Sequence, residues 1–543
     1  MEETAEHADA PEDEARYVLD ENQRLSRSVL WRLQRQFFDR QGAQSWTEGT
    51  VPHYITSNPW IAGAYARVVF GWLRDVYADL DRSQPVYVVE LGCGSGRFGF
   101  LFLNAFLDRL RRSALCDAPV TYVLTDFTDF NLDVLRSHPS LQSFVEDDLL
   151  DFARFDAEHD TELALSHSGA LLAPGAIANP VAVLANYFFD SLPHDVFYVH
   201  DGDLYEGLVT VSTTDTDPDL TDPELISRIE LAYDYQPAPA NYYDDPAFNR
   251  LLDAYRQQLD DTVLTFPNAG LRCIQALRDL SDGRLLLLSG DKGYSHEEAL
   301  QHRDEPGLIV HGSISLAVNY HALGQYVHCQ GGAALHLAHR PANLNVSAFL
   351  FGPSPTDYVE TRLAYDEAIE KQGPDTFFAL KKGAEKNYDA FTLEQLLGYL
   401  RLVGWDHNIV LGALPALMAH AQTASEDLLA ELHRTIEQVW AAYFPLREPR
   451  DLAFHLGILL YEMQYYAGAL DFFEHSLRLY GPDPATAFNQ ALCHFHLGTL
   501  NDALLHINQA LEADANNADA RALNLEIMSA LSQENLQSPD DSR

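Results

Sequence analysis

The chain has 543 residues, which predicts two or three domains, and 47% of them are hydrophobic, enough for ordered cores. Its formal net charge of −44 repels phosphate backbones and anionic lipid, which argues against nucleic acid and membrane surfaces as main partners. The charge serves solubility or attracts a basic protein partner, and charge alone leaves both interpretations open.

Cysteine usage and apolar segments indicate the compartment. Five cysteines are scattered without a CxxC pair, which argues against a disulfide framework or a metal site. The first residues are acidic and lack the apolar core of a signal peptide. The longest apolar stretch, Ile409–Ala421, contains Pro415 and is too short to span a bilayer. We therefore expect a cytoplasmic protein that binds no metal.

Residues 16–352 are predicted to form an α/β domain, after a disordered acidic tail at 1–15. Helical periodicity alternates there with short β-rich runs, several of which are continuously apolar, as strands covered on both faces must be. The last two runs predict an antiparallel hairpin that closes the sheet. The runs are Val86–Leu91, Thr121–Thr125, Gln142–Glu146, Val181–Ala185, Leu285–Ser289, Ala333–Ala338 and Asn345–Phe351.

An insertion at about 200–282 interrupts this pattern. It contains an acidic, Thr-rich stretch and an aromatic run, and it is predicted to be loop plus helices at Asp245–Leu259 and Leu271–Leu280. Insertions of this length in a compact domain commonly form lids or binding surfaces.

The region 388–532 is predicted to be helical, after a linker at 353–387 and before a tail at 533–543. A 34-residue period, with small residues where paired helices touch, is typical of tetratricopeptide repeats. It predicts units at 450–481 and 484–515, which either present a concave surface to a protein segment or serve only as a structural appendage. The matching pairs are Gly457 and Ala491, Tyr466 and Leu500, Ala469 and Ala503, Phe473 and Ile507, and Ser476 and Ala510.

A glycine-rich turn follows the first predicted strand of the α/β domain. Gly92, Gly94 and Gly96 lie between the strand and an apolar helix. Glycines let the backbone approach a ligand closely, and the helix start offers free N–H groups to oxygen acceptors. Both dinucleotides and S-adenosylmethionine are bound by such turns, and a formal GxGxxG is present at Gly94–Gly99.

Acidic residues at successive strand ends favour S-adenosylmethionine. Glu90 precedes the glycines and suits a cationic amino-acid tail better than a pyrophosphate. Asp126 ends the second strand, where an acid accepts the ribose hydroxyls, although it could instead cap the next helix. Asp147 and Asp148 are predicted at the carboxyl end of the third strand, to hold the adenine amino group or to face solvent. Together these residues predict a site for this cofactor.

Segments across residues 50–350 resemble the MidA-like methyltransferases. The similar pieces are PHYITSNPWIAGAYARVVFGWL (Pro52–Leu73), ELGCGSGRFG, ANYFFDSLP (Ala185–Pro193), GRLLLLSGDKGY (Gly283–Tyr294) and HGSISLAVNYHALGQYV (His311–Val327). The resemblance implies a Rossmann-like class I methyltransferase domain with S-adenosylmethionine as its cofactor and a protein arginine as acceptor. The predicted repeats are not part of the core of that family.

The acceptor side departs from the family pattern. Tyr187 stands where the family has Glu, which leaves arginine as the acceptor in doubt because a carboxylate is the natural partner of a guanidinium. We expect Asn186 and Asp190 to orient the acceptor, and His194 or Asp195 to handle a proton, unless His194 is only a polar loop residue.

Three functions follow from these observations. The leading one is methylation of a protein side chain, with a substrate or partner, basic in character, recruited partly by the repeats. The second is methylation of a small molecule, with the repeats forming a homodimer. The third is a catalytically silent scaffold that binds the cofactor, which the departure at Tyr187 motivates.

Overall fold

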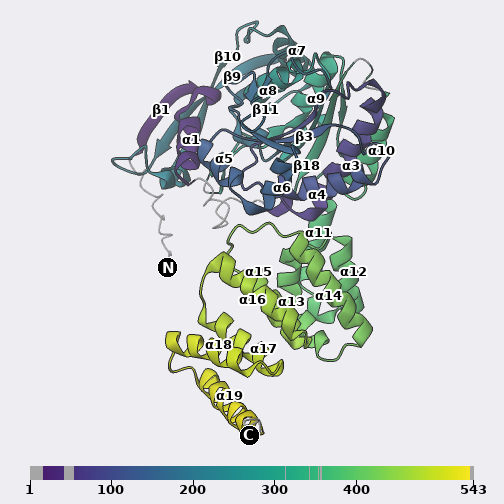
Figure 1. Cartoon of the computed structure of the whole chain (residues 1–543). Coiled ribbons are helices and arrows are strands. Elements are labelled where there is room, and N and C mark those ends of the chain that lie inside the picture. Colours follow the sequence, from purple (N-terminus) through teal and green to yellow (C-terminus); the bar gives the residue numbers. More distant parts are fainter. Residues whose placement is uncertain are drawn as a thin grey trace, which may run out of the picture. The chain divides into compact units, whose positions relative to one another are not determined.

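A computed structural model describes residues 16–41 and 54–537, apart from 312, 342, 353, 355 and 356. It divides into two compact units, Met1–Ser57 with Ile61–Thr376, and Asn58–Trp60 with Phe377–Arg543 (Figure 1). The tail predicted at 1–15 lies outside the described residues, as do residues 538–543. The other predicted tail begins too early, because helix α19 (Ala518–Gln537) continues past residue 533.

A seven-stranded mixed sheet is the centre of the first unit. Its strands are parallel except β18, which is antiparallel to both of its neighbours and so confirms the predicted closing hairpin. Six of the seven predicted runs are strands of this sheet. In order across it, they and one further strand are β17 (Ala333–Leu335), β18 (Asn345–Phe351), β12 (Leu285–Asp291), β7 (Val181–Asn186), β2 (Val86–Leu91), β3 (Val120–Asp126) and β4 (Leu150–Arg154).

The run Gln142–Glu146 is not a strand. It forms the short helix α6, and the third strand in chain order is β4, which starts four residues after the helix ends. The ring of Phe144 packs edge-on against Phe100 of helix α4 (Arg97–Arg111). A short apolar run fits a helix turn or a strand equally well, so tertiary packing decides between them.

Three strands of the insertion join β1 and β8 in a second, five-stranded sheet, where the sequence predicted a loop. Strand β10 lines one edge of the long strand β9, and β8 and β1 follow one another along its other edge. Side chains of β10 alternate between half-buried and exposed, so period-2 alternation was the sequence signal for this strand. The strands are β1 (Tyr17–Arg24), β8 (Asp195–His200), β9 (Asp203–Thr213), β10 (Ile229–Pro237) and β11 (Thr262–Phe266).

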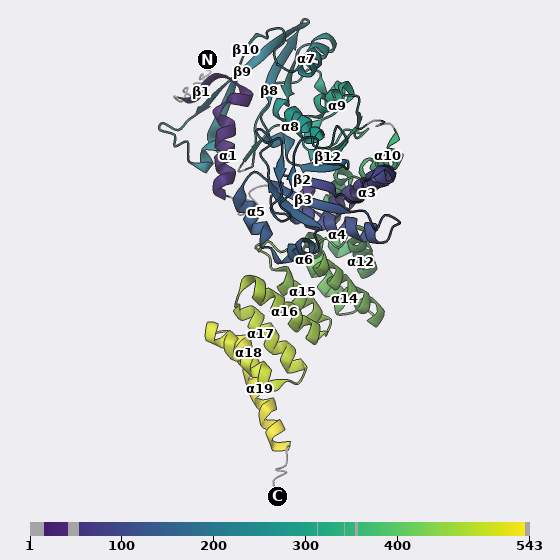
Figure 2. The same cartoon turned by 45° about the horizontal axis from the view of Figure 1, so that its top comes forward.

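Helix α1 (Val29–Gln41) packs on this second sheet, beside β1 in both views (Figures 1 and 2). Leu30, Trp31 and Leu33 belong to one buried cluster with Val209 and Val211 of β9. The predicted helices of the insertion are present as α7 (Pro246–Gln258) and α8 (Asn268–Asp279). The N-terminal segment and the insertion therefore form one substructure.

The remaining helices of the first unit surround the main sheet. They include α10, which lies in the predicted linker and is anchored to α3 because the Asp75 carboxylate accepts the N–H groups of Glu360 and Thr361 (3.0 and 2.8 Å). None of the described helices is both long and apolar enough to cross a membrane. These helices are α3 (Pro59–Val76), α5 (Asp129–Arg136), α9 (Tyr320–Cys329) and α10 (Val359–Tyr365), and α11 (Pro374–Glu385) follows them in the chain. The short strands outside the two sheets are β5 (Leu163–Ala164), β6 (Leu171–Leu172), β13 (Gly293–Tyr294), β14 (Ile309–His311), β15 (Ser313–Ser315) and β16 (Val318–Asn319).

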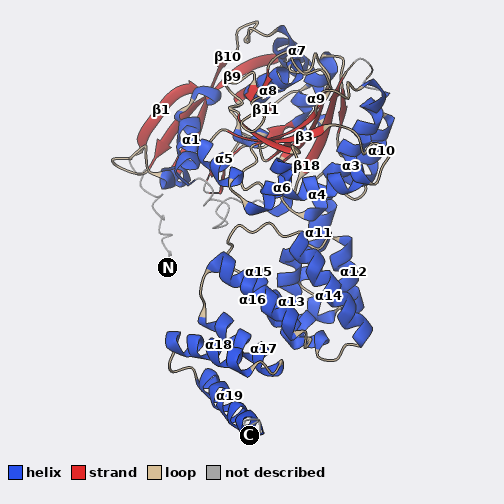
Figure 3. Cartoon of the chain, in the orientation of Figure 1, coloured by secondary structure: helices blue, strands red, loops and turns tan. Residues whose placement is uncertain are grey.

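The described part of the second unit is helical (Figure 3). Two helix pairs fall on the segments predicted as repeats, and Ala469, Ala491 and Ala503 are buried where paired helices meet. The helices are α12 (Leu393–Leu402), α13 (His407–Ala421), α14 (Glu426–Ala441), α15 (Leu452–Glu462), α16 (Tyr466–Tyr480), α17 (Pro484–His496), α18 (Leu500–Ala513) and α19.

Replacing Gly457 with alanine is expected to destabilise the helix pair α15 and α16 by about 1–3 kcal/mol, through overpacking. A Cβ at this position would lie 2.6 Å from Cε1 of the Phe473 ring, whereas a Cβ on Gly468 would have no neighbour nearer than 3.8 Å. Gly468→Ala is therefore the matched control, and we expect it to stabilise its helix. Thermal unfolding and hydrogen exchange of both variants measure the difference, and equal effects would contradict this packing.

Candidate functional site

A crevice lies at the carboxyl ends of β2, β3, β4, β7 and β12. From β2, the next strand of this sheet along the chain, β3, lies on one side, whereas the later strand β7 lies on the other side. The strand order therefore reverses at β2, and ligands commonly bind at such a point. Two adjoining pockets fill the crevice, with about 900 and 800 Å³ of empty space including their open mouths. Phe38, Gly92, Tyr187 and Ser191 line both, so one elongated ligand can span them.

The predicted glycine turn forms the floor of this crevice. Gly92, Gly94 and Gly96 all adopt positive φ angles (+59°, +49° and +73°), which favour glycine. Gly92 and Gly94 line the first pocket. Gly96 instead shapes the turn, since a Cβ on it would lie 2.5 Å from Cδ2 of Leu135.

Glu90 lies beside this turn and lines the first pocket. The residue is only 6% exposed, and its carboxyl group accepts a hydrogen bond of 2.7 Å from the Tyr122 hydroxyl. Burial raises the pKa of Glu90 to about 8, although the hydrogen bond from Tyr122 acts to lower it, and no described cation is among the groups that shift it. A cationic ligand group in the first pocket would relieve this cost.

Asp126 lines the second pocket, at the end of β3. Its Oδ1 accepts hydrogen bonds from the backbone N–H and the hydroxyl of Thr128 (2.9 and 2.8 Å), so it also holds the start of α5. Its Oδ2 accepts a long hydrogen bond of 3.3 Å from Asn131, and the backbone N–H of Gly94 also donates to this carboxylate. Burial raises the pKa of Asp126, against the opposing effect of these hydrogen bonds.

Asp147 and Asp148 do not reach this crevice. They precede β4 instead of following it, and they therefore lie at the amino end of that strand. The Asp148 side chain is 89% exposed and faces His167. The acid that does follow β4 is Asp156, which lines the second pocket. Sequence reasoning missed it because the strand was placed on α6, several residues too early.

Helix α1 roofs the second pocket through Trp31, Gln34, Arg35 and Phe38. The Arg35 guanidinium donates two parallel hydrogen bonds to the Asp156 carboxylate (2.8 and 2.9 Å). Burial acts to raise the pKa of Asp156, yet the hydrogen bond from Arg35 holds it at about 2. No local pattern connects residues so distant in the sequence, so this roof was not predicted.

Arg35→Gln is expected to loosen the roof, because a neutral amide cannot replace the two charge-assisted bonds to Asp156. We expect a loss of about 1 kcal/mol in the free energy of unfolding, since Arg35 is partly exposed. Faster hydrogen exchange of the α1 backbone checks this result. Arg32→Gln, at an exposed position of the same helix, is the control. Equal exchange in both variants would show that the ion pair does not hold the helix.

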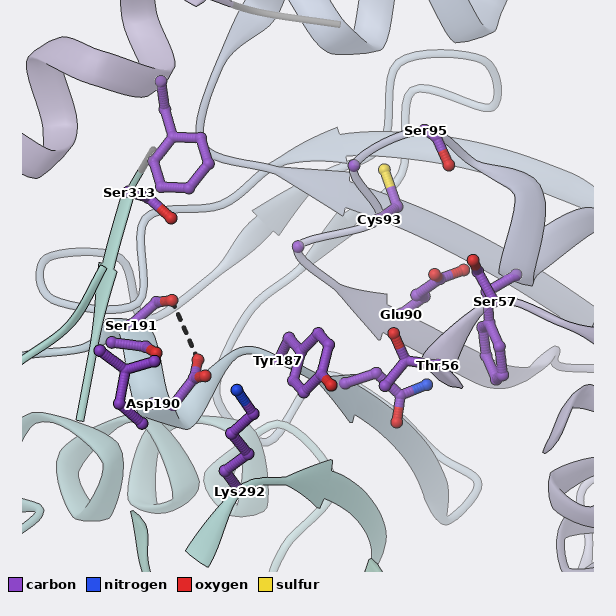
Figure 4. A pocket seen from close by; sticks show the side chains of 17 residues that line it. Thr56, Ser57, Glu90, Cys93, Ser95, Tyr187, Asp190, Ser191, Lys292 and Ser313 are labelled. Carbon is purple, nitrogen blue, oxygen red and sulfur yellow. Dashed lines mark hydrogen bonds between the residues drawn. The ribbon is translucent and has the colours of Figure 1, made fainter. Parts of the chain in front are cut away.

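The other end of the first pocket is formed after β7 and β12 (Figure 4). The Asn186 Oδ1 accepts a hydrogen bond of 2.8 Å from the Tyr65 hydroxyl, which fixes its amide. Tyr187 has a positive φ of +49° and lines both pockets. Figure 4 shows Lys292 extending toward Asp190 and Tyr187. No sequence pattern predicted a role for Lys292.

His194 lies away from both pockets. It is fully buried, and its Nε2 lies 3.0 Å from the backbone oxygen of Phe189. Burial lowers the pKa of His194 to about 4, so the ring is neutral at pH 7. The prediction that it handles a proton in the site is therefore wrong: the side chain supports the turn after β7 from inside the core.

No family model matches the chain, and no curated protein matches it. Two solved structures from Burkholderia thailandensis have a likeness to part of it. One is a COG1565 superfamily member, considered a methyl transferase and bound to S-adenosyl-homocysteine; it is 13% identical with a TM-score of 0.35, over 59% of this chain and 75% of that one. The other, an uncharacterized COG1565 superfamily protein, is 14% identical with a TM-score of 0.35, over 65% of this chain and 84% of that one. Such scores are too low to transfer a function.

Proposed function

We propose that this chain is a methyltransferase that uses S-adenosylmethionine. The observation that carries the proposal is Glu90, a buried carboxyl group without a cation of its own among the described residues. It lies next to a glycine turn whose Gly94 N–H donates to Asp126 at the end of β3. A dinucleotide would place its pyrophosphate beside Glu90, where two negative charges would repel each other. The sheet order, with one antiparallel strand next to one edge, supports a Rossmann-like class I methyltransferase fold.

The crevice residues divide the cofactor between the two pockets. Glu90 would accept hydrogen bonds from the amino-acid ammonium, and Gly92 and Gly94 would allow the backbone to approach this tail. Asp126 would accept the ribose hydroxyls, and the roof around Arg35 would cover the adenine. The bound cofactor supplies a methyl group on a sulfonium, which is already an activated leaving group, so the protein mainly positions the reactants.

We propose a protein side chain as the acceptor, with the helical unit recruiting the protein that carries it. The paired helices and their 34-residue spacing support tetratricopeptide-type repeats, and the net charge of −44 favours a basic partner. Lys292 in the acceptor end of the pocket disfavours the arginine that the family resemblance implied, because two cations repel.

A small-molecule acceptor is the second candidate. Hydroxyl groups of Thr56, Ser57, Ser191, Ser313 and Ser315 line the first pocket, which gives it the polar lining that suits a small, hydrogen-bonding molecule. In that case the helical unit would serve oligomerisation, as a homodimer contact.

Calorimetric titration of the full chain with S-adenosylmethionine and S-adenosylhomocysteine tests the cofactor proposal. Absence of binding would overturn it. Incubation with radiolabelled cofactor and extract from a strain lacking the gene then separates the acceptors: a labelled protein band supports the first, and a labelled small molecule the second. Binding without any transfer would identify a silent scaffold.

A further inference from the structure

Two carboxyl groups meet at the acceptor end of the first pocket. Asp190 lies in the turn after β7, and Asp291 is the last residue of β12, the parallel neighbour of β7. Asp190 lines the pocket and is 5% exposed, whereas Asp291 is completely shielded from solvent. A buried pair of acids cannot be held as two full negative charges without a large cost.

The hydrogen bonds of Asp291 are incomplete. Its Oδ2 accepts the backbone N–H groups of Phe188 and Phe189 (3.3 and 3.1 Å). Its Oδ1 is buried and has no donor among the described residues. Asp190 is the neighbouring carboxyl group, within hydrogen-bond reach of Asp291. Its own Oδ1 accepts a hydrogen bond of 3.0 Å from the Ser191 hydroxyl, and the Ser315 hydroxyl also donates to it. Two acceptors that face each other form a hydrogen bond only when one of them carries a proton.

The surroundings fix the charge of this pair. Burial raises the pKa of both carboxyl groups, and the charge of Asp190 raises that of Asp291 further. Lys292, directly after β12, is the cation beside them and acts in the opposite direction on the pKa of Asp190. Among the described residues, the phenols of Tyr65 from α3, Tyr187 after β7 and Tyr320 from α9 also face the pair. If the pair holds one proton, it carries a single negative charge, and the positive charge of Lys292 balances it.

We propose that Asp190 and Asp291 share one proton, and that Asp190 accepts the proton that the methyl acceptor gives up. The inference rests on the proposed function. It also assigns the acceptor to the class of uncharged groups that bear an N–H or O–H, since Lys292 and the singly charged pair already balance and a cationic acceptor would leave a net positive charge in the site. Asp190 is the member of the pair that lines the pocket, and Asp291 is a positioning residue behind it.

The transfer step conserves atoms and charge. A lone pair on the acceptor nitrogen or oxygen forms a bond to the methyl carbon, and the carbon–sulfur bond breaks with its electron pair moving to sulfur. The proton of the acceptor passes to a carboxylate oxygen of Asp190 and leaves through the open pocket. Positioned bases of this kind contribute roughly 10²- to 10⁴-fold to rates.

Infrared spectroscopy of the full chain with S-adenosylhomocysteine tests the shared proton directly. We expect a carbonyl stretch of a protonated carboxyl group at pH 7 that disappears in both Asp190→Asn and Asp291→Asn. Each amide donates to the remaining carboxylate, which then needs no proton. Glu90→Gln is the control in the ligand-free protein, where the raised pKa of Glu90 gives a separate band. A band that only one of the two variants removes, or that both retain, would overturn the shared proton.

Transfer of label from radiolabelled S-adenosylmethionine to the extract tests the role of Asp190. We expect Asp190→Asn to reduce transfer by roughly 10²- to 10⁴-fold with affinity for S-adenosylhomocysteine within about threefold. Asp291→Asn should shift the acid limb of the pH–rate profile to higher pH, since an amide donates a weaker hydrogen bond to the Asp190 carboxylate than the protonated Asp291 does. An unchanged profile would contradict this role. Failure to bind S-adenosylhomocysteine would instead overturn the proposed function.

Discussion

Glu90→Gln is expected to weaken the binding of S-adenosylmethionine by roughly 30- to 150-fold, the equivalent of about 2–3 kcal/mol for a lost charge-assisted hydrogen bond. Glutamine has the same shape and keeps an oxygen that can accept the hydrogen bond from Tyr122. The substitution therefore removes the charge with little change in packing. Calorimetric titration at pH 8, where about half of Glu90 is already ionised before the ligand binds, measures the effect. An affinity within about threefold of the wild type would show that Glu90 is not the partner of the ammonium group.

The same substitution is expected to stabilise the ligand-free protein at alkaline pH. The pKa of Glu90 is about 8 in the folded protein and near its ordinary value of 4.5 in the unfolded chain. Between these values the folded protein binds more protons than the unfolded chain, so its stability falls as the pH rises. Glutamine has no such titration, so the advantage of the variant grows from pH 5 to pH 8 and reaches on the order of a few kcal/mol. Urea unfolding at both pH values measures it; a constant difference would contradict the raised pKa.

Gly96→Ala is expected to destabilise the first unit by about 2–4 kcal/mol. The positive φ of +73° disfavours a side chain, and the added Cβ would lie 2.5 Å from Cδ2 of Leu135. Because Gly96 shapes the cofactor turn, we also expect weaker binding of S-adenosylhomocysteine.

Gly63→Ala is the matched control for Gly96→Ala. Gly63 lies within helix α3, and a Cβ there would meet no atom within 4 Å. We expect this variant to be more stable by about 0.5–1 kcal/mol, from the lower backbone entropy of the unfolded chain. Chemical unfolding of both variants tests the difference. If Gly96→Ala left the free energy of unfolding unchanged, the turn would tolerate a side chain.

The sequence was most informative where the signal is local. The glycine turn, with Glu90 before it and Asp126 at the end of the next strand, could be read from residues close in the chain because a strand, a turn and a helix follow one another there. The strand before Asp156 was missed because apolar residues in α6 imitate a strand. The roof by Arg35 and the pairing of Asp190 with Asp291 depend on segments far apart in the chain, which no periodicity connects.

The N-terminal segment has a consequence for synthesis on the ribosome. Tyr17 of β1 pairs opposite Thr213, and the Gln34 amide of α1 donates a hydrogen bond of 2.8 Å to the backbone oxygen of Ile314. A nascent chain therefore makes the glycine turn early, but its first helix gains its partners in β9 only after residue 211, and its hydrogen bond to Ile314 only after residue 314, has left the exit tunnel. Pairings of such long sequence separation form late and slowly. A prematurely terminated chain should thus be unable to retain the cofactor, which restricts cofactor capture to chains whose α/β domain is nearly complete.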